Sequence, residues 1–296
     1  MSGRQPFFSV IIPTFNSAAT VGLAISSVFC QTFNSVELIL VDGASTDDTL
    51  RLARDSVPEL YKSQIKIISE PDQGIYDAMN KGVRNSAGDY LLFLGSDDSL
   101  FDSAVLENVF SILTLEPYKI VYGKIQAVNS RDDLLDGLVY GIEASRLSIY
   151  FNNIYHQSTL YHRSCFDELG LFDGTFRIQA DWAFNLLCFA KFKPKFINII
   201  IARYNVLGAS SNNDKEFQRK KFSIYISAFS FNPFDERYSV FLWDYNNYYK
   251  QQLEQGNVVA GLLYQLVFHW HLRIKHIDKV KALPKNIFER IDRWRS

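Results

Sequence analysis

The chain has 296 residues, of which 47% are hydrophobic and 21% are charged, so it contains enough apolar material for a globular core. Lysine and arginine number 31 and aspartate and glutamate 32, and this balance argues against a nucleic-acid partner. No segment reaches the roughly 18 to 20 apolar residues of a membrane-spanning helix. The N-terminus has no long apolar segment of the kind that marks a secretory signal.

The three cysteines, Cys30, Cys165 and Cys188, are far apart and form no motif with zinc spacing. We interpret them as buried thiols in a reducing compartment. A cytoplasmic location is therefore expected.

The first hundred residues alternate short apolar runs with amphipathic stretches. Apolar runs predict strands at 8–12, 36–41, 65–68 and 90–94, and the amphipathic stretches predict helices at about 17–30, 46–56 and 75–87. Nearly continuous apolar runs are typical of parallel strands that are buried on both faces. Their spacing suits βαβ units, so we expect an open, mainly parallel α/β sheet.

The pattern after residue 115 is mixed. Residues 119–128 (KIVYGKIQAV) predict two strands around Gly123, and residues 148–166 predict extended segments that lead into a helix. A helix at 181–192 and a strand at 194–206 follow. After residue 212 the composition changes, with eleven aromatic residues between Phe222 and Tyr249. We expect a domain at 1–212, with halves at about 7–115 and 116–212, and a helical, aromatic-rich C-terminal extension at 213–296.

Polar residues follow each strand of the first half. They read PTFN, DGASTDDT, EPDQG and GSDD. In parallel α/β sheets ligands bind beyond the carboxyl ends of the strands, so these segments predict one acid-rich crevice. The chain has neither a GxGxxG dinucleotide motif nor a GxxxxGK[ST] phosphate loop. A phosphate-containing ligand would then need another positive charge.

Asp97 and Asp98 could supply that charge by holding a divalent cation, because such ions bind to one or two carboxylates and to diphosphate oxygens. Alternatively, Ser96 and the two acids cap the following helix. Asp42 could accept hydrogen bonds from a nucleoside or cap a helix, and Asp72 could bind the same ligand or shape a turn.

In the second half, Asp181 opens an amphipathic helix. It could complement the helix dipole, or it could be a general base if it faces a bound electrophile. The neighbouring His156 and Gln157 could be structural, or they could contact a hydroxylated acceptor or a diphosphate.

Several motifs in this order resemble family 2 glycosyltransferases of the GT-A fold. Residues 8–50 (FSVIIPTFN to DGASTDDTL), 69–98 (SEPDQG to FLGSDD) and 156–184 (HQSTLYHRSC to ADWAF) carry the resemblance, which covers roughly residues 7–212. It implies a Rossmann-like, mainly parallel central sheet with flanking helices.

The resemblance also implies roles for individual residues. Nucleotide-sugar contacts fall on Thr14, Asn16, Asp42, Asp72 and Asp97, and Asp98 falls on the metal ligand of a DxD-type motif that is reduced here to Ser-Asp-Asp. Asp181 falls on the catalytic base of the family's Glu-Asp motif. Ala180 replaces the first acid of that motif, which leaves the role of position 180 open.

The resemblance implies inverting transfer of a sugar from a nucleoside-diphosphate sugar to a glycan or lipid-linked glycan in cell-surface polysaccharide synthesis. UDP is the preferred donor nucleotide, and Mn²⁺ or Mg²⁺ is the expected cofactor. The alternatives are a non-catalytic nucleotide-sugar-binding module and a metal-dependent nucleotidyltransferase.

The C-terminal tail lies outside the resemblance. Residues 272–296 contain eight lysines or arginines and three acids. Together with the apolar stretch 258–272, this segment could contact the inner face of the plasma membrane peripherally. It could equally pack on the catalytic domain or on another copy of the chain in a homo-oligomer.

Overall fold

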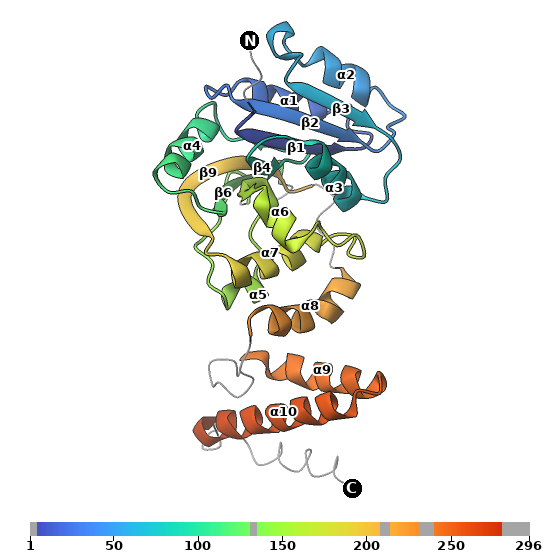
Figure 1. The fold of residues 1–296 in the computed structure, drawn as a ribbon, viewed down its shortest axis with the longest axis vertical. Helices are drawn as coiled ribbons and strands as arrows, with labels where there is room; N and C mark the ends of the chain where they lie inside the picture. Colours follow the sequence, from blue (N-terminus) through green and yellow to red (C-terminus); the bar gives the residue numbers. More distant parts are fainter. Residues whose placement is uncertain (1–4, 131–134, 208–213, 231–239, 280–296) are drawn as a thin grey trace. The chain divides into compact units, whose positions relative to one another are not determined.

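The structure is a computed structural model that describes residues 5–130, 135–207, 214–230 and 240–279, with side chains to residue 272 (Figure 1). The chain divides into two compact units, Met1–Ala228 and Phe229–Ser296. The domain boundary expected after residue 212 lies outside the described residues.

One curled sheet organises the first unit, in the order β3-β2-β1-β4-β8-β6-β9-β5, with β7 paired to β6. The first four strands are parallel, as expected, whereas β8 joins β4 antiparallel. The strands are β1 (Phe8–Thr14), β2 (Val36–Asp42), β3 (Ile65–Ser69), β4 (Tyr90–Phe93), β5 (Ser99–Leu100), β6 (Ile120–Val128), β7 (Val139–Tyr140), β8 (Thr159–His162) and β9 (Lys195–Asn205).

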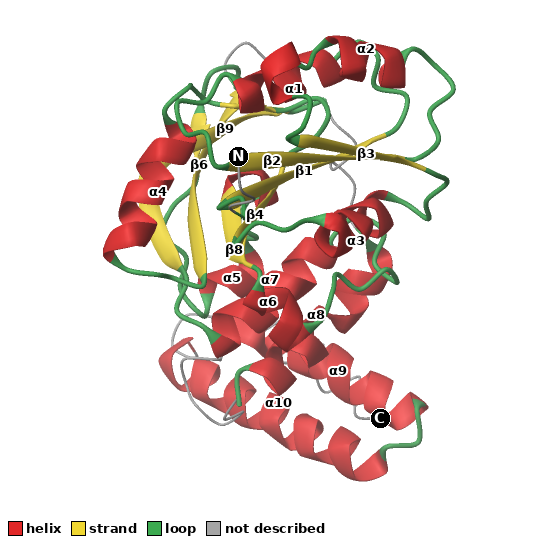
Figure 2. Cartoon of the chain, turned by 45° about the horizontal axis from the view of Figure 1, so that its top comes forward, coloured by secondary structure: helices red, strands yellow, loops and turns green. Residues whose placement is uncertain are grey.

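Helices cover both faces of the parallel half. Figures 1 and 2 show α1 and α2 on one face of β1–β3 and α3 on the other. The helices of this unit are α1 (Val21–Phe29), α2 (Thr49–Asp55), α3 (Ile75–Asn85), α4 (Val105–Leu115), α5 (Ser148–Phe151), α6 (Ser164–Leu169), α7 (Ala180–Lys191) and α8 (Lys215–Ala228), with short 3-10 helices at Glu59–Tyr61 and His156–Ser158.

The alternation of side chains along β1 explains this layering. Val10 and Ile12 join the core cluster that includes Ile25 of α1, while Ile11 faces Gly82 of α3. A Cβ on Gly82 would lie 2.3 Å from the side chain of Ile11, so α3 packs directly on the strand. Both faces of β1 are therefore buried, which accounts for its continuous apolar run.

The expectation of two strands around Gly123 was wrong, because β6 is one strand that runs through this residue. Its register against β9 shifts between Tyr122 and Lys124 and again between Lys124 and Ile125. A Cβ on Gly123 would lie 2.6 Å from the carbonyl oxygen of Ile199. The glycine thus permits close backbone approach at an irregularity in the strand and does not form a turn.

The second unit contains α9 (Leu242–Glu254) and α10 (Val258–Lys279). Within it the rings of Tyr245 and His271 stack with centroids 5.0 Å apart. In the part of the chain that the structure describes, no helix combines the length and apolarity needed to cross a membrane. Of the three cysteines, Cys165 and Cys188 are buried as expected, whereas Cys30 is exposed because it lies at the C-terminal end of α1.

Candidate functional site

The carboxyl ends of β1 and β2 lie side by side. Thr14 pairs with Asp42 in the parallel register, and the N–H of Gly43 donates to the carbonyl of Thr14 (2.9 Å). The polar segments after these two strands therefore begin at the same edge of the sheet.

Hydrogen bonds join the loop after β1 to the loop after β2. The N–H of Asn16 donates to Ser45 (2.8 Å), and the side-chain carbonyl of Asn16 accepts from the N–H of Thr46 (2.9 Å). Asn16 has a φ of 48°, a left-handed conformation that asparagine adopts more readily than most residues. This exchange of bonds holds the first loop in one conformation.

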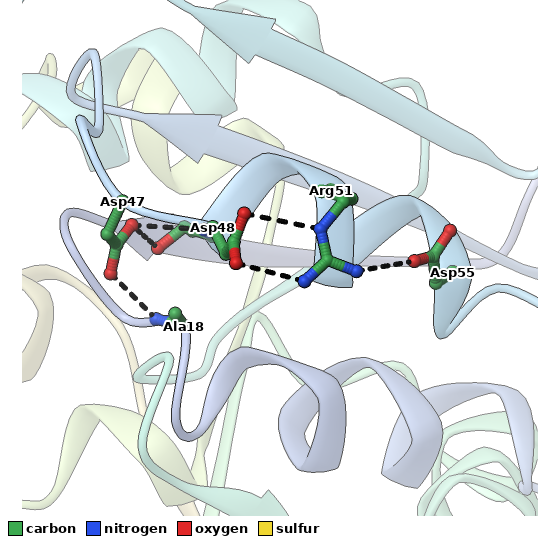
Figure 3. A network of polar contacts seen from close by, with 6 residues as sticks. Ala18, Asp47, Asp48, Arg51 and Asp55 are labelled. Atoms are coloured by element: carbon green, nitrogen blue, oxygen red, sulfur yellow. Dashed lines mark hydrogen bonds and ion pairs between the residues drawn. The ribbon is translucent and has the colours of Figure 1, made fainter.

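Asp47 makes a third connection between these loops, shown in Figure 3. Its carboxylate accepts from the N–H of Ala18 (3.2 Å) and from the side chain and N–H of Thr49. The hydrogen bond from the Thr49 hydroxyl is the main reason that the pKa of Asp47 is lowered. On the next turn Arg51 pairs with Asp48 (3.0 Å) and Asp55 (3.3 Å), and because all three are exposed these pairs contribute little to stability.

A cavity of about 600 Å³ opens beyond these strand ends, and we call it the acidic cavity. Its lining brings together seven of the predicted site residues: Thr14, Asn16, Asp72, Asp97, Asp98, His156 and Gln157. Among the described residues that line it there is no lysine or arginine. The hydroxyl of Thr14 is buried and has no hydrogen-bond partner among the described residues.

Asp97 and Asp98 both line the acidic cavity. The N–H of Asn205 donates to Asp98 (2.8 Å), which is only 3% exposed. Burial, and then the charge of Asp97, raise the pKa of Asp98 to about 6. Burial also raises the pKa of Asp97. Burial thus makes it costly for both acids to carry a charge, and a bound cation would offset that cost.

Gly95 permits this arrangement. A Cβ at this position would lie 2.5 Å from a carboxylate oxygen of Asp98 and 2.9 Å from one of Asp97. Both acids therefore fold back over the backbone of Gly95, and a larger residue would displace them.

The other two acids of the first half that were predicted for the site, Asp42 and Asp72, differ in position. Asp42 is fully buried and does not line the acidic cavity, because its carboxylate accepts from the hydroxyls of Ser45 and Ser69 (2.7 Å to Ser69). Asp72 lies at the cavity wall and accepts from the N–H of Gly74 (2.9 Å). A Cβ on Gly43 would come within 2.6 Å of Asp72.

Asp181 lines a second cavity of about 460 Å³, which we call the Asp181 cavity. The residue is 5% exposed at the start of α7. The hydroxyl of Tyr76 donates to its Oδ1 (2.6 Å) and also contacts the carbonyl of Ile178, and the side chain of Asn153 donates to its Oδ2 (2.8 Å). Burial, and then the charge of Asp181, raise the pKa of Tyr76, which keeps this phenol protonated.

The two cavities meet at His156 and Gln157, which line both of them together with Ile75 and Tyr204. Nδ1 of His156 lies 3.5 Å from Oδ2 of Asp181. The charge of His156 also lowers the pKa of Asp97 and Asp98, against the larger effect of burial. His156 therefore stands between the acid pair and the buried aspartate.

Two sequence comparisons identify the family of this chain. The model of the family described as "Glycosyl transferase family 2" matches residues 9–169. The chain belongs to glycosyl transferase family 2. A PGL/p-HBAD biosynthesis glycosyltransferase of Mycobacterium tuberculosis is 39% identical over 220 residues, which are 73% of this chain and 84% of the relative.

Solved structures confirm the fold expected for a family 2 glycosyltransferase. TarS 1-349 of S. aureus, in complex with UDP-GlcNAc, superposes with a TM-score of 0.61 at 17% identity over 75% of this chain and 66% of that chain. The mannosyltransferase PcManGT from Pyrobaculum calidifontis, in complex with GDP-Man and Mn²⁺, has a TM-score of 0.52 at 17% identity over 77% of this chain and 64% of that chain.

Three residues of this candidate site were absent from the sequence prediction: Tyr76, Asn153 and Asn205. Tyr76 is 105 residues from the aspartate that it contacts, and Asn205 donates through its backbone. Asn153 also accepts from Asn185 (2.9 Å) on the next turn of α7 after Asp181. The only feature of the sequence that could have pointed to any of these residues was the position of Tyr76 beside the EPDQG segment.

Proposed function

We propose that this glycosyltransferase moves a sugar, with inversion, from a nucleoside-diphosphate sugar to a hydroxyl of a glycan or lipid-linked glycan acceptor. The observation that carries the proposal is the junction of the two cavities at His156. The acidic cavity would hold the donor, and the Asp181 cavity would hold the acceptor. A bound donor and a bound acceptor would then meet where the cavities join.

The lining of the acidic cavity supports a metal-dependent donor site. A nucleoside diphosphate carries several negative charges, and the described lining offers it carboxylates and no lysine or arginine. Among the described residues no three histidine, cysteine or acidic side chains are grouped for metal binding. Mg²⁺ or Mn²⁺ would therefore bind through Asp98, with Asp97 on the sugar side, and would take its other ligands from diphosphate oxygens and water. When bound, such an ion stabilises the negative charge of the leaving diphosphate.

Asp181 would act as the general base. Its two oxygens are oriented by Tyr76 and Asn153, and its carboxylate lines the cavity in which the acceptor would bind. It would take the proton of the acceptor hydroxyl as that oxygen attacks the anomeric carbon. Attack on the face opposite the diphosphate forms the new glycosidic bond, breaks the bond to the diphosphate and inverts the configuration.

UDP is the first choice of donor nucleotide. TarS binds UDP and UDP-GlcNAc, and PcManGT binds GDP-Man with Mn²⁺, so both uridine and guanosine donors are compatible with this fold. The relative from PGL/p-HBAD biosynthesis supports a biosynthetic role. We place that role in the synthesis of cell-surface glycans.

A thermal-shift screen tests the donor site. UDP, GDP, dTDP and their sugars would each be added to the full chain with and without Mn²⁺. Saturation at about 100 times the dissociation constant adds about 2.7 kcal/mol to the free energy of unfolding, which shifts Tm by several degrees. We expect a shift with UDP or a UDP-sugar that requires Mn²⁺. The absence of a shift with every nucleotide would overturn the proposal.

The second unit supports a peripheral contact with the inner face of the plasma membrane. Five apolar residues of α10 are 43–84% exposed: Val258, Val259, Leu262, Leu263 and Leu266. Their spacing places them along one side of the helix. The sequence from residue 272 onward has eight basic and three acidic residues, a composition that favours anionic lipid.

Vesicle sedimentation tests this contact. The protein should sediment with phosphatidylcholine vesicles that contain phosphatidylglycerol, and the double substitution Leu262→Ser and Leu266→Ser should reduce the bound fraction several-fold. If sedimentation is unchanged but the variant changes from dimer to monomer in analytical ultracentrifugation, α10 is instead a homo-oligomer interface.

A further inference from the structure

A third cavity, of about 270 Å³, lies beside the Asp181 cavity, and we call it the apolar cavity. The two share four consecutive residues, 152–155. The rest of its lining comes from residues 122–123, 140–142, 144 and 148. It therefore adjoins the site proposed for the acceptor, and β6 and the segments on both sides of α5 form its wall.

Three of the polar side chains at this wall, those of Tyr122, Ser148 and Asn153, have partners within the protein. The hydroxyl of Tyr122 accepts from the N–H of Ala144 (2.8 Å), and Ser148 exchanges hydrogen bonds with Ser145. Both polar atoms of the Asn153 side chain have partners, because its oxygen accepts from Asn185 and its nitrogen donates to Asp181. The lining that remains for a ligand includes the side chains of Tyr140, Ile142, Ile154 and Tyr155, which offer hydrocarbon and aromatic surface.

Apolar side chains continue from this cavity onto the surface. Within residues 135–151, five large hydrophobic residues are 43–78% exposed: Leu135, Leu138, Val139, Ile142 and Phe151. Ile142 is the most exposed of them and also lines the apolar cavity, whereas Phe151 lines the Asp181 cavity. Single exposed apolar residues are ordinary, but a group of them in one segment that also lines a cavity is typical of a binding site.

The apolar cavity is also close to the proposed base. Asn153 lines both cavities and donates to Oδ2 of Asp181 at 2.8 Å. A molecule whose hydroxyl faces Asp181 could therefore extend past Asn153 along Ile154 and Tyr155.

We propose that the apolar cavity binds an apolar aglycone, either an alkyl chain or an aromatic ring, of the acceptor. This inference rests on the proposed function, because it assumes that the acceptor hydroxyl faces Asp181. It makes the acceptor an amphiphile, with its reacting sugar or hydroxyl in the Asp181 cavity and its apolar part in the neighbouring one. Burial of each methylene strengthens binding about fourfold, so two buried methylenes raise affinity more than tenfold.

Saturation-transfer difference NMR tests the cavity without any need for turnover. The probes are octyl, phenyl and methyl β-D-glucosides, with the octyl compound below the concentration at which it forms micelles. We expect strong saturation transfer to the octyl chain or to the phenyl ring, and weak transfer to the methyl glucoside. The group that receives the stronger signal shows which kind of aglycone the cavity binds. Equal signals from all three would overturn the inference.

Two substitutions localise the binding. Ala144→Leu reduces the space in the cavity, and Ile142→Asn replaces an apolar wall with an amide of similar size. Both should reduce the aglycone signal several-fold. Leu60→Asn is the matched control, because Leu60 is 79% exposed against 78% for Ile142 and does not line the cavity. If the signal survives both cavity variants, or falls equally in the control, the inference is wrong.

Transfer assays separate this inference from the proposed function. Methyl and octyl glycosides of a panel of sugars would be compared as acceptors with a UDP-sugar and Mn²⁺. We expect kcat/KM to be at least tenfold higher for the octyl member of the accepted pair. Equal values within that pair would refute the aglycone site while leaving the glycosyltransferase activity intact. Absence of both transfer and donor hydrolysis would refute the proposed function, and the NMR result would still decide whether the cavity binds an apolar group.

Discussion

The hydroxyl of Tyr76 on α3 donates a 2.6 Å hydrogen bond to Oδ1 of Asp181 on α7. The two residues are 105 positions apart, so this bond ties the first half of the domain to the second. It also orients one oxygen of the proposed base.

Tyr76→Phe should therefore lower the rate of sugar transfer or donor hydrolysis while donor affinity is retained. A hydrogen bond to a charged group contributes about 1.5–3 kcal/mol, and loss of part of it predicts a fall in kcat of about tenfold. Nucleotide release gives the rate, and calorimetry gives the affinity. Tyr90→Phe is the control, because its buried ring carries a hydroxyl that bonds to the carbonyl of Tyr118. An equal loss in both variants would point to stability and not to Asp181.

Asp98→Ala should abolish metal-dependent donor binding. Loss of even an outer-shell partner costs a metal site about 10- to 100-fold in affinity, so loss of the proposed ligand should weaken donor binding in Mn²⁺ about 100-fold or more. Calorimetric titration with the donor nucleotide measures this. Asp102→Ala, at an exposed acid that does not line the acidic cavity, should bind normally. Unchanged binding in Asp98→Ala would remove this residue from the metal site.

Asp181→Asn should give the opposite pattern. The amide keeps the size of the side chain but cannot take a proton, so kcat should fall about 100- to 10,000-fold, the usual contribution of a general base. Donor binding should be preserved because Asp181 lies in the other cavity. A variant that retains more than a tenth of the wild-type rate would exclude Asp181 as the base.

Gly95→Ala should weaken donor binding without unfolding the chain. The added Cβ would lie 2.5 Å from Asp98 and 2.9 Å from Asp97, so both carboxylates must move. We expect at least a tenfold loss of Mn²⁺-dependent donor affinity. Gly174→Ala provides the comparison, since a Cβ there meets nothing within 4 Å. Wild-type affinity in Gly95→Ala would show that the positions of the two acids are not critical.

Asp214 should make stability depend on pH. Burial acts to raise its pKa, but the N–H groups of Phe217, Ile178, Arg177 and Glu216 donate to its carboxylate and hold the pKa below the ordinary value. A lowered pKa stabilises the fold above the unfolded-state value of about 3.9, and this contribution is lost as pH falls through the folded-state pKa.

Asp214→Asn should therefore lower the free energy of unfolding by about 1–2 kcal/mol at pH 7, because the amide nitrogen cannot accept from the N–H groups of Arg177 and Ile178. The difference from wild type should shrink below about pH 4 as the native carboxylate becomes protonated. Urea unfolding at pH 7 and pH 3 measures both values. Asp173→Asn, at an exposed acid that caps only the N–H of Thr175, should show little effect at either pH. A difference that stays constant across this range would contradict the role of the charge.

Much of the fold could be predicted from local sequence patterns. The runs that start at Phe8, Val36, Ile65 and Tyr90 are strands in the structure. Strands β1, β2 and β4 are almost entirely buried, which requires a continuous apolar sequence, whereas β3 lies at the edge of the sheet and is only partly buried. The prediction of a turn at Gly123 was wrong because glycine occurs both in turns and where two backbones approach closely. Only the neighbouring strand, with the carbonyl of Ile199 beside this glycine, distinguishes the two.

The candidate site was accessible in part. The acids after the strands indicated a polar crevice, and Asp97 and Asp98 do line the acidic cavity together with Asp72. Asp42 has the same kind of position in the sequence, yet its carboxylate is engaged by Ser45 and Ser69. Spacing alone cannot distinguish an acid that faces a cavity from one whose buried carboxylate already accepts hydrogen bonds within the protein.

The family, the α/β fold class and the strands of the first half follow from local sequence, since ordered motifs and hydrophobic periodicity are properties of neighbouring residues. The folded chain alone shows that Tyr76 and Asn153 hold Asp181, and that His156 lies where the acidic and Asp181 cavities meet. These relationships join side chains from helices and loops far apart in the chain. Their distances depend on how the helices pack against the sheet, and no local pattern records that packing.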